Sequence, residues 1–137
     1  MTAEEVVARQ HEVKLYMRHA DKMLQVAEHN VTQGFYSTAV NRAYYAVFYA
    51  ANSLLSTQRL SRSKHSGVIA AFRQHFVKSG LIEAKYSRMY GQLMDDRSGA
   101  DYELETDIEP EQAIVDVEHA HQFVGRIRQY LQEEGWL

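Results

Sequence analysis

The sequence predicts an all-α protein, an antiparallel bundle of four to five helices. Proline occurs once and glycine seven times in 137 residues, so few residues interrupt long helices. Apolar residues recur at three- and four-residue steps, which is the stripe of an amphipathic helix. Hydrophobic residues make up 45% of the chain and charged residues 24%, which is the balance of a folded globular protein.

Length and composition restrict the class of protein further. A chain of 137 residues suits one core, so we expect residues 1–137 to form a single domain. The chain has no cysteine, which excludes disulfides, thiolate metal sites and cysteine nucleophiles. It has neither an apolar run of about 18 residues nor a secretory pattern at its start, so we expect a cytoplasmic protein without a membrane partner.

The first predicted helix runs from about Glu4 to His29. Its apolar stripe consists of Val6, Val13, Met17, Ala20, Leu24 and Ala27. A turn is expected to follow, in which Gly34 can adopt the left-handed conformation.

The second predicted helix, from about Tyr36 to Ser56, differs from the first because it is apolar on nearly every face. Residues 43–51 read AYYAVFYAA. The many alanines and the scarcity of β-branched residues favour a helix over a strand. A helix that is apolar all round belongs in the middle of a bundle, so we expect this to be the central helix.

Three further helices complete the predicted bundle. A polar connector, residues 56–63, precedes them. Their apolar positions are Val68, Ile69, Phe72 and Phe76 in the third helix, Ile82, Tyr86, Met89, Tyr90 and Leu93 in the fourth, and Ile114, Val117, Val124, Ile127 and Leu131 in the last. Gly99 and the acidic residues 101–109 predict a loop. Pro110 suits the first turn of the last helix, where its missing amide proton costs nothing.

A charged group falls on the inward stripe of the fourth helix. After Leu93 the next step reaches Asp96 or Arg97, and a charge at such a position needs a partner or a ligand. Arg97, Asp101 and Tyr102 supply a cation, a carboxylate and a phenol within six positions. They are candidate catalytic residues; the alternative is an Arg97–Asp101 ion pair with Tyr102 packed at the end of the bundle.

Polar residues also interrupt the central helix. Asn41 and Arg42 lie one turn before Tyr45 in the most apolar segment of the chain. These three residues are candidates for a polar, substrate-binding patch that faces the end of the fourth helix. The alternative is a buried hydrogen-bond network that fixes the register of the helices.

Lys64 and His65 open the third predicted helix. Backbone amide protons and local positive charge at this position can hold an anion such as a phosphate. The alternative is a plain helix start that is capped by Ser63 or Ser66. A formal net charge of −3 gives the whole chain no attraction to nucleic acid, so RNA binding would depend on local basic residues of this kind.

The sequence predicts neither a metal site nor a cofactor. Of the seven histidines, His119 and His121 are two positions apart, so on a helix they point to different sides. The chain has no HExxH motif, no glycine-rich phosphate loop and no GxSxG motif.

Three motifs in this order resemble the HEPN domain (higher eukaryotes and prokaryotes nucleotide-binding). They are STAVNRAYYAVFYAA at residues 37–51, KHSGV at 64–68 and RSGADY at 97–102. The chain is most similar to the small stand-alone HEPN proteins of bacteria and archaea. The resemblance implies a helical bundle that usually forms a homodimer. It also implies a partner, because many members act with a small nucleotidyltransferase as a toxin–antitoxin pair.

The resemblance also implies a chemistry. In active HEPN toxins an arginine, followed four to six residues later by a histidine, forms a metal-independent ribonuclease site at the dimer interface. Arg97 matches the arginine, whereas Asp101 or Tyr102 stands where the histidine is expected. Tyr102 also resembles a tyrosine to which the nucleotidyltransferase adds nucleotides in related pairs. His65 is another histidine that could serve, but no feature of the sequence places it beside Arg97.

Three functions follow as alternatives from this resemblance. The first is a module that binds RNA, a nucleotide or the nucleotidyltransferase and has weak ribonuclease activity. The second is an active ribonuclease toxin. The third is a purely structural dimer. The replaced histidine favours the first over the second, and the clustered Arg97, Asp101 and Tyr102 favour either over the third.

Overall fold

The computed structural model describes the backbone of residues 1–102 and 108–137 and the side chains of residues 1–99 and 108–137. Within this part the elements are α1 (Ala3–Thr32), α2 (Tyr36–Thr57), α3 (His65–Phe72), the π-helical turn η1 (Arg73–Val77), α4 (Ala84–Tyr102) and α5 (Pro110–Glu133). None of the described residues forms a strand. The predicted all-α class is confirmed.

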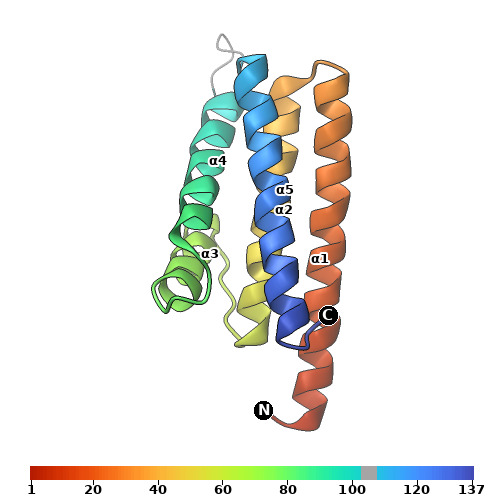
Figure 1. The fold of residues 1–137 in the computed structure, drawn as a ribbon, viewed down its shortest axis with the longest axis vertical. Helices are drawn as coiled ribbons and strands as arrows, with labels where there is room; N and C mark the ends of the chain where they lie inside the picture. Colours follow the sequence, from red (N-terminus) through yellow and green to blue (C-terminus); the bar gives the residue numbers. More distant parts are fainter. Residues whose placement is uncertain (103–107) are drawn as a thin grey trace.

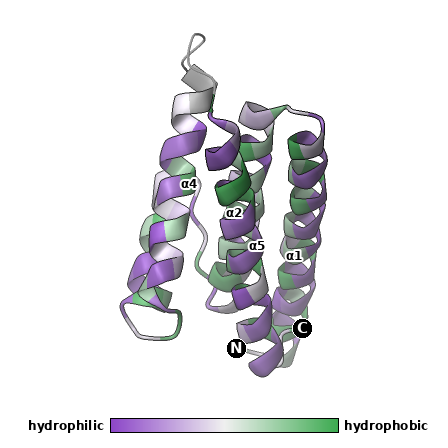
Figure 2. Cartoon of the chain, turned by 45° about the horizontal axis from the view of Figure 1, so that its top comes forward, coloured by the Kyte–Doolittle hydropathy of each residue, from purple (hydrophilic) through white to green (hydrophobic). Residues whose placement is uncertain are grey.

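The four long helices run side by side as an antiparallel bundle (Figure 1). The short α3 and η1 pack at the side, next to the start of α4. α2 contacts every other α-helix, so it is the central helix that its apolar composition predicts. The other long helices carry hydrophilic and hydrophobic residues on different faces (Figure 2).

Small side chains let the neighbouring helices approach α2 closely. Its fully buried alanines are Ala39, Ala43, Ala46, Ala50 and Ala51. Aromatic rings fill the wider space between α2, α3, α4 and α5, where Tyr90 lies 5.8 Å from Phe72 and 5.6 Å from Phe123 between ring centroids. Close packing of this kind fixes the positions of the helices relative to one another.

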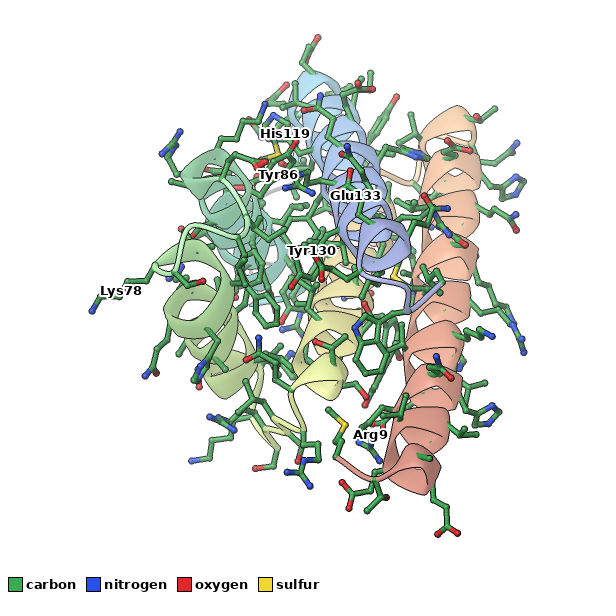
Figure 3. The ribbon with its side chains drawn as sticks, turned by 60° about the horizontal axis from the view of Figure 1, so that its bottom comes forward. Arg9, Lys78, Tyr86, His119, Tyr130 and Glu133 are labelled. Carbon is green, nitrogen blue, oxygen red and sulfur yellow. The ribbon has the colours of Figure 1, made fainter. Side chains whose placement is uncertain are left out.

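The third predicted helix is interrupted by a π-helical turn. The amide of Lys78 donates to the carbonyl of Arg73 at 2.8 Å, five residues back. This turn directs Phe76 into the core, where its ring meets Tyr130 edge-on at 6.1 Å. Figure 3 shows Tyr130 of α5 pointing toward the interior of the bundle, whereas Lys78 points away from it.

Two local predictions were wrong. Gly99, predicted to open a loop, is helical, and α4 continues to Tyr102. A single glycine costs a helix only about 1 kcal/mol relative to alanine, so it did not end α4. Ile114, predicted to face inward, is 52% exposed, and the buried positions of that turn are Ala113 and Val117. Residues 103–107 of the predicted loop lie outside the described residues.

Candidate functional site

Four side chains from three helices meet where α2 packs against α3 and α4. Arg97 comes from the last turns of α4, Tyr44 and Tyr45 from the middle of α2, and His65 from the first residue of α3. Tyr44 is fully buried, and the other three are half-buried. We refer to these four residues as the Arg97 site.

Arg97 lies over the faces of two tyrosines. Its guanidinium carbon is 5.0 Å from the ring centroid of Tyr44 and 5.5 Å from that of Tyr45. Its terminal nitrogen also donates to the hydroxyl oxygen of Tyr45 at 3.5 Å. Aromatic faces attract a cation, so the two rings help to hold this guanidinium in place.

His65 reaches the same place from α3. Its Nδ1 is 2.9 Å from the hydroxyl oxygen of Tyr44, and its ring lies 4.3 Å from that of Phe48. Burial, and then the positive charge of Arg97, lower the pKa of His65 below its ordinary 6.5. The imidazole is therefore neutral near pH 7 and able to accept a proton.

Tyr44 lies between the cation and the imidazole. Burial raises the pKa of Tyr44 to about 12, although Arg97 opposes that shift. Its hydroxyl thus stays protonated and can donate to Nδ1 of His65 or accept from it. When Nδ1 carries the proton and donates it to Tyr44, Nε2 keeps its lone pair.

In the structure, the residues of the predicted patch on α2 face different helices. Tyr45 faces Arg97, and Asn41 is half-buried one turn before it. Arg42 instead points toward α1, where its guanidinium lies 3.8 Å from the sulfur of Met23. Arg42 therefore does not face the end of α4.

The predicted capping of α3 by Ser63 or Ser66 was wrong. Lys64 occupies the capping position, and none of the described side chains forms a capping hydrogen bond there. Lys64 itself is exposed next to His65. The residue that precedes α3 therefore adds a positive charge next to His65.

The remaining catalytic candidates stay predictions. Asp101 and Tyr102 belong to the last turn of α4, but their side chains lie outside the described residues. The predicted Arg97–Asp101 ion pair, the packing of Tyr102 and its modification are untested for the same reason.

A buried carboxylate close to Asp96 was missed by the sequence analysis. Asp116 of α5 is fully buried, and Gln112 donates both to it at 3.1 Å and to Asp96 at 3.2 Å. Burial, and then the neighbouring Asp96, raise the pKa of Asp116 to about 8. The one signal in the sequence was its spacing of three and four residues from Ala113 and Ala120, which places all three on one face of the helix. Both alanines are fully buried.

The described residues contain no group of three His, Asp or Glu side chains arranged as metal ligands. Nor does any helix in this part combine the length and apolar character needed to cross a membrane.

Comparison with known proteins identifies relatives along most of the chain. The protein named "Putative toxin MJ0605" of Methanocaldococcus jannaschii is 36% identical over 122 residues, covering 89% of this chain and 90% of that protein. "Putative toxin MJ0142" of the same organism is 30% identical over 120 residues, covering 88% and 82%. A UPF0332 protein of Thermotoga maritima is 32% identical over 121 residues, covering 88% and 92%.

The sequence model of the HEPN domain matches residues 13–134, which include the Arg97 site. The match begins within α1 and ends just after α5, so it includes most of α1 and all the later helices. The chain therefore belongs to the HEPN domain family.

Proposed function

We propose that this chain is a toxin-like HEPN protein that binds RNA at the Arg97 site and cleaves it weakly without a metal ion. The observation that carries the proposal is the hydrogen bond between His65 and Tyr44, on whose ring the Arg97 guanidinium lies. Through this hydrogen bond a histidine belongs to the same site as the arginine, although the motif at residues 97–102 contains no histidine. Two relatives named as putative toxins support the toxin-like role.

Binding of a phosphate follows from the charges of the site. A guanidinium is always protonated and matches the geometry of phosphate oxygens. Because Arg97 is half-buried against two rings, its attraction to an anion is screened less than that of an exposed arginine. The exposed Lys64 beside His65 adds a second positive charge for the neighbouring phosphate.

Cleavage needs a proton acceptor and a cation. Nε2 of neutral His65 accepts the proton of a ribose 2′-hydroxyl, whose oxygen attacks the adjacent phosphorus. The bond from phosphorus to the 5′ oxygen breaks, and this oxygen takes a proton from water. The products are a 2′,3′-cyclic phosphate and a 5′-hydroxyl. Arg97 stabilises the charge that develops on the phosphorus oxygens. The lowered pKa of His65 makes it a weak base, which is why we expect slow cleavage.

A cleavage and binding assay in EDTA tests this function. Wild-type protein should bind single-stranded RNA and release a 2′,3′-cyclic phosphate. His65→Ala should lower the cleavage rate about 100-fold while leaving binding largely intact. Arg97→Ala should weaken binding as well, and Arg97→Lys should restore it in part. Arg88→Ala, an exposed arginine of the same helix, is the matched control. Folded wild-type protein that neither binds nor cleaves RNA would refute the proposal.

We further propose that the protein acts as a homodimer in the cytoplasm and pairs with a small nucleotidyltransferase. Support comes from the family resemblance and from Tyr102 near the arginine of the motif. The test is incubation with the nucleotidyltransferase encoded beside it and a nucleoside triphosphate. We expect a nucleotide mass on the Tyr102 peptide and none in Tyr102→Phe. Partner binding without RNA cleavage would favour the binding module over the active toxin.

A further inference from the structure

Among the described residues, no helix covers one side of the bundle. α5 packs against α1, α2 and α4, but within the described part of the chain neither α3 nor α4 contacts α1. Figure 1 views the α5 side, where α2 lies behind α5 and between α1 and α4. The side of α2 that faces away from α5 is therefore flanked by α1 on one edge and by α3 and α4 on the other.

Half-exposed polar and aromatic residues occupy this side of α2. At three- and four-residue spacing they are Asn41, Tyr45, Phe48, Tyr49 and Asn52. They contrast with the rest of the helix, where the alanines and Tyr44 are fully buried. A half-exposed stripe on the most apolar helix of a protein indicates a surface for a ligand or a partner.

The rings continue from α2 onto α1 without interruption. The ring of Tyr49 lies 6.2 Å from that of Tyr45 on α2, 6.4 Å from Tyr16 on α1 and 5.4 Å from His19 on α1. We call these four residues the aromatic row. The row starts at the Arg97 site, because the Arg97 guanidinium lies 5.5 Å from the ring of Tyr45.

Two arginines lie near the aromatic row. Arg97 lies at one end, and Arg42 lies one turn before Tyr45 on the same helix. At the other end, burial raises the pKa of Tyr16, and the negative charge of Glu12 adds to this shift. Glu12 forms an ion pair with Arg9 at 2.5 Å, which compensates its charge. An anionic ligand with aromatic faces complements these cations and rings.

We propose that the aromatic row is a base-stacking surface for single-stranded RNA, which deepens the proposed function and rests on it. With one phosphate at Arg97, the neighbouring bases lie along Tyr45, Tyr49 and then Tyr16 or His19. Every base has a π-face, so such stacking tolerates many sequences. Bases in a duplex are already stacked on each other, so the row selects single strands.

Binding of a labelled 2′-O-methyl oligonucleotide, which the protein cannot cleave, tests the row directly. Tyr49→Ala should weaken binding about tenfold, because it removes the ring that contacts the other three. Tyr49→Phe keeps the ring and should retain the wild-type affinity. Phe35→Ala is the matched control, since Phe35 is an aromatic residue that is 60% exposed outside the row. A duplex of the same sequence should bind more weakly than the single strand.

An abasic oligonucleotide gives a second measurement that needs no variant. It keeps the phosphates and lacks the bases, so wild-type protein should bind it about as weakly as Tyr49→Ala binds the complete strand. Suppose that wild-type protein binds the abasic strand with full affinity, that Tyr49→Ala binds the complete strand with full affinity, and that Arg97→Ala loses binding. The stacking surface is then wrong and the RNA site stands. If folded wild-type protein binds no RNA, both proposals are refuted. A wild-type dimer that Tyr49→Ala converts to a monomer, with unchanged RNA affinity, would assign the row to a second copy and overturn the stacking surface.

Discussion

At the scale of single residues, the site depends on a neutral imidazole next to a permanent cation. His65 has a lowered pKa because it is partly buried and because Arg97 is close. The unfolded chain therefore takes up a proton at His65 before the folded chain does as the pH falls through 6.5. The contribution of His65 to folding stability is complete above that pH and is lost below it.

The same shift predicts how the cleavage rate depends on pH. Only the neutral imidazole accepts the 2′-hydroxyl proton, so the rate should fall as the pH decreases through a value below 6.5. The rate should be constant above that value until another group titrates. Rates measured from pH 4.5 to pH 8 on His65→Ala should show no such inflection, and His75→Ala serves as the control. A rate that rises toward acid pH would contradict the role of His65 as the base.

Asp116 gives a second prediction at this scale, with the opposite dependence of stability on pH. Its pKa rises from 3.8 to about 8 on folding, so the folded state binds the extra proton between these values. The free energy of unfolding should therefore decrease as the pH rises from about 4 to about 8. Asp116→Asn cannot ionise and should be less sensitive to pH and more stable than wild type at pH 8.

Urea unfolding at pH 5 and pH 8 measures this difference. Asp95→Asn, an exposed carboxylate one position before Asp96, is the control and should follow the wild-type curve. Equal pH dependence in wild type and Asp116→Asn would show that the buried carboxylate titrates normally.

At the scale of helices, α4 carries the largest departure from the sequence prediction. The pattern of Gly99 followed by acidic residues predicts a loop, whereas the helix continues through Gly99 to Tyr102. A longer α4 places Arg97 inside a regular helix, from which its side chain packs against α2. Arg97 is thereby held by helix packing, and a loop would hold it less firmly.

Substitution of Gly99 distinguishes a helix from a loop at this position. A β-carbon on Gly99 would meet none of the described atoms within 4 Å, and its backbone is helical. Gly99→Ala should therefore stabilise the protein by about 0.4 to 1 kcal/mol in urea unfolding. Gly34→Ala is the contrasting variant and should destabilise it, because Gly34 has a φ of 79°. Destabilisation by Gly99→Ala would indicate the predicted loop.

At the scale of the whole molecule, the helices could be predicted from the sequence and the site only in part. Helical periodicity is local, so α1 and α2 begin and end within a few residues of their predicted bounds, and α5 begins at Pro110 as predicted. The contact of His65 with Tyr44 joins residues 21 positions apart and depends on the path of the connector, which no periodicity describes. Asp116 was missed because an isolated aspartate on an amphipathic helix usually faces solvent.

The measurement that tests the central claim most directly is a double-mutant cycle of RNA cleavage on Arg97 and His65. If both residues act on one phosphate through the Tyr44 ring between them, Arg97→Ala and His65→Ala should each remove most of the metal-free cleavage. The double variant should then be little worse than either single variant. Rate losses that simply multiply would show that the two residues act independently, and this would contradict a single site.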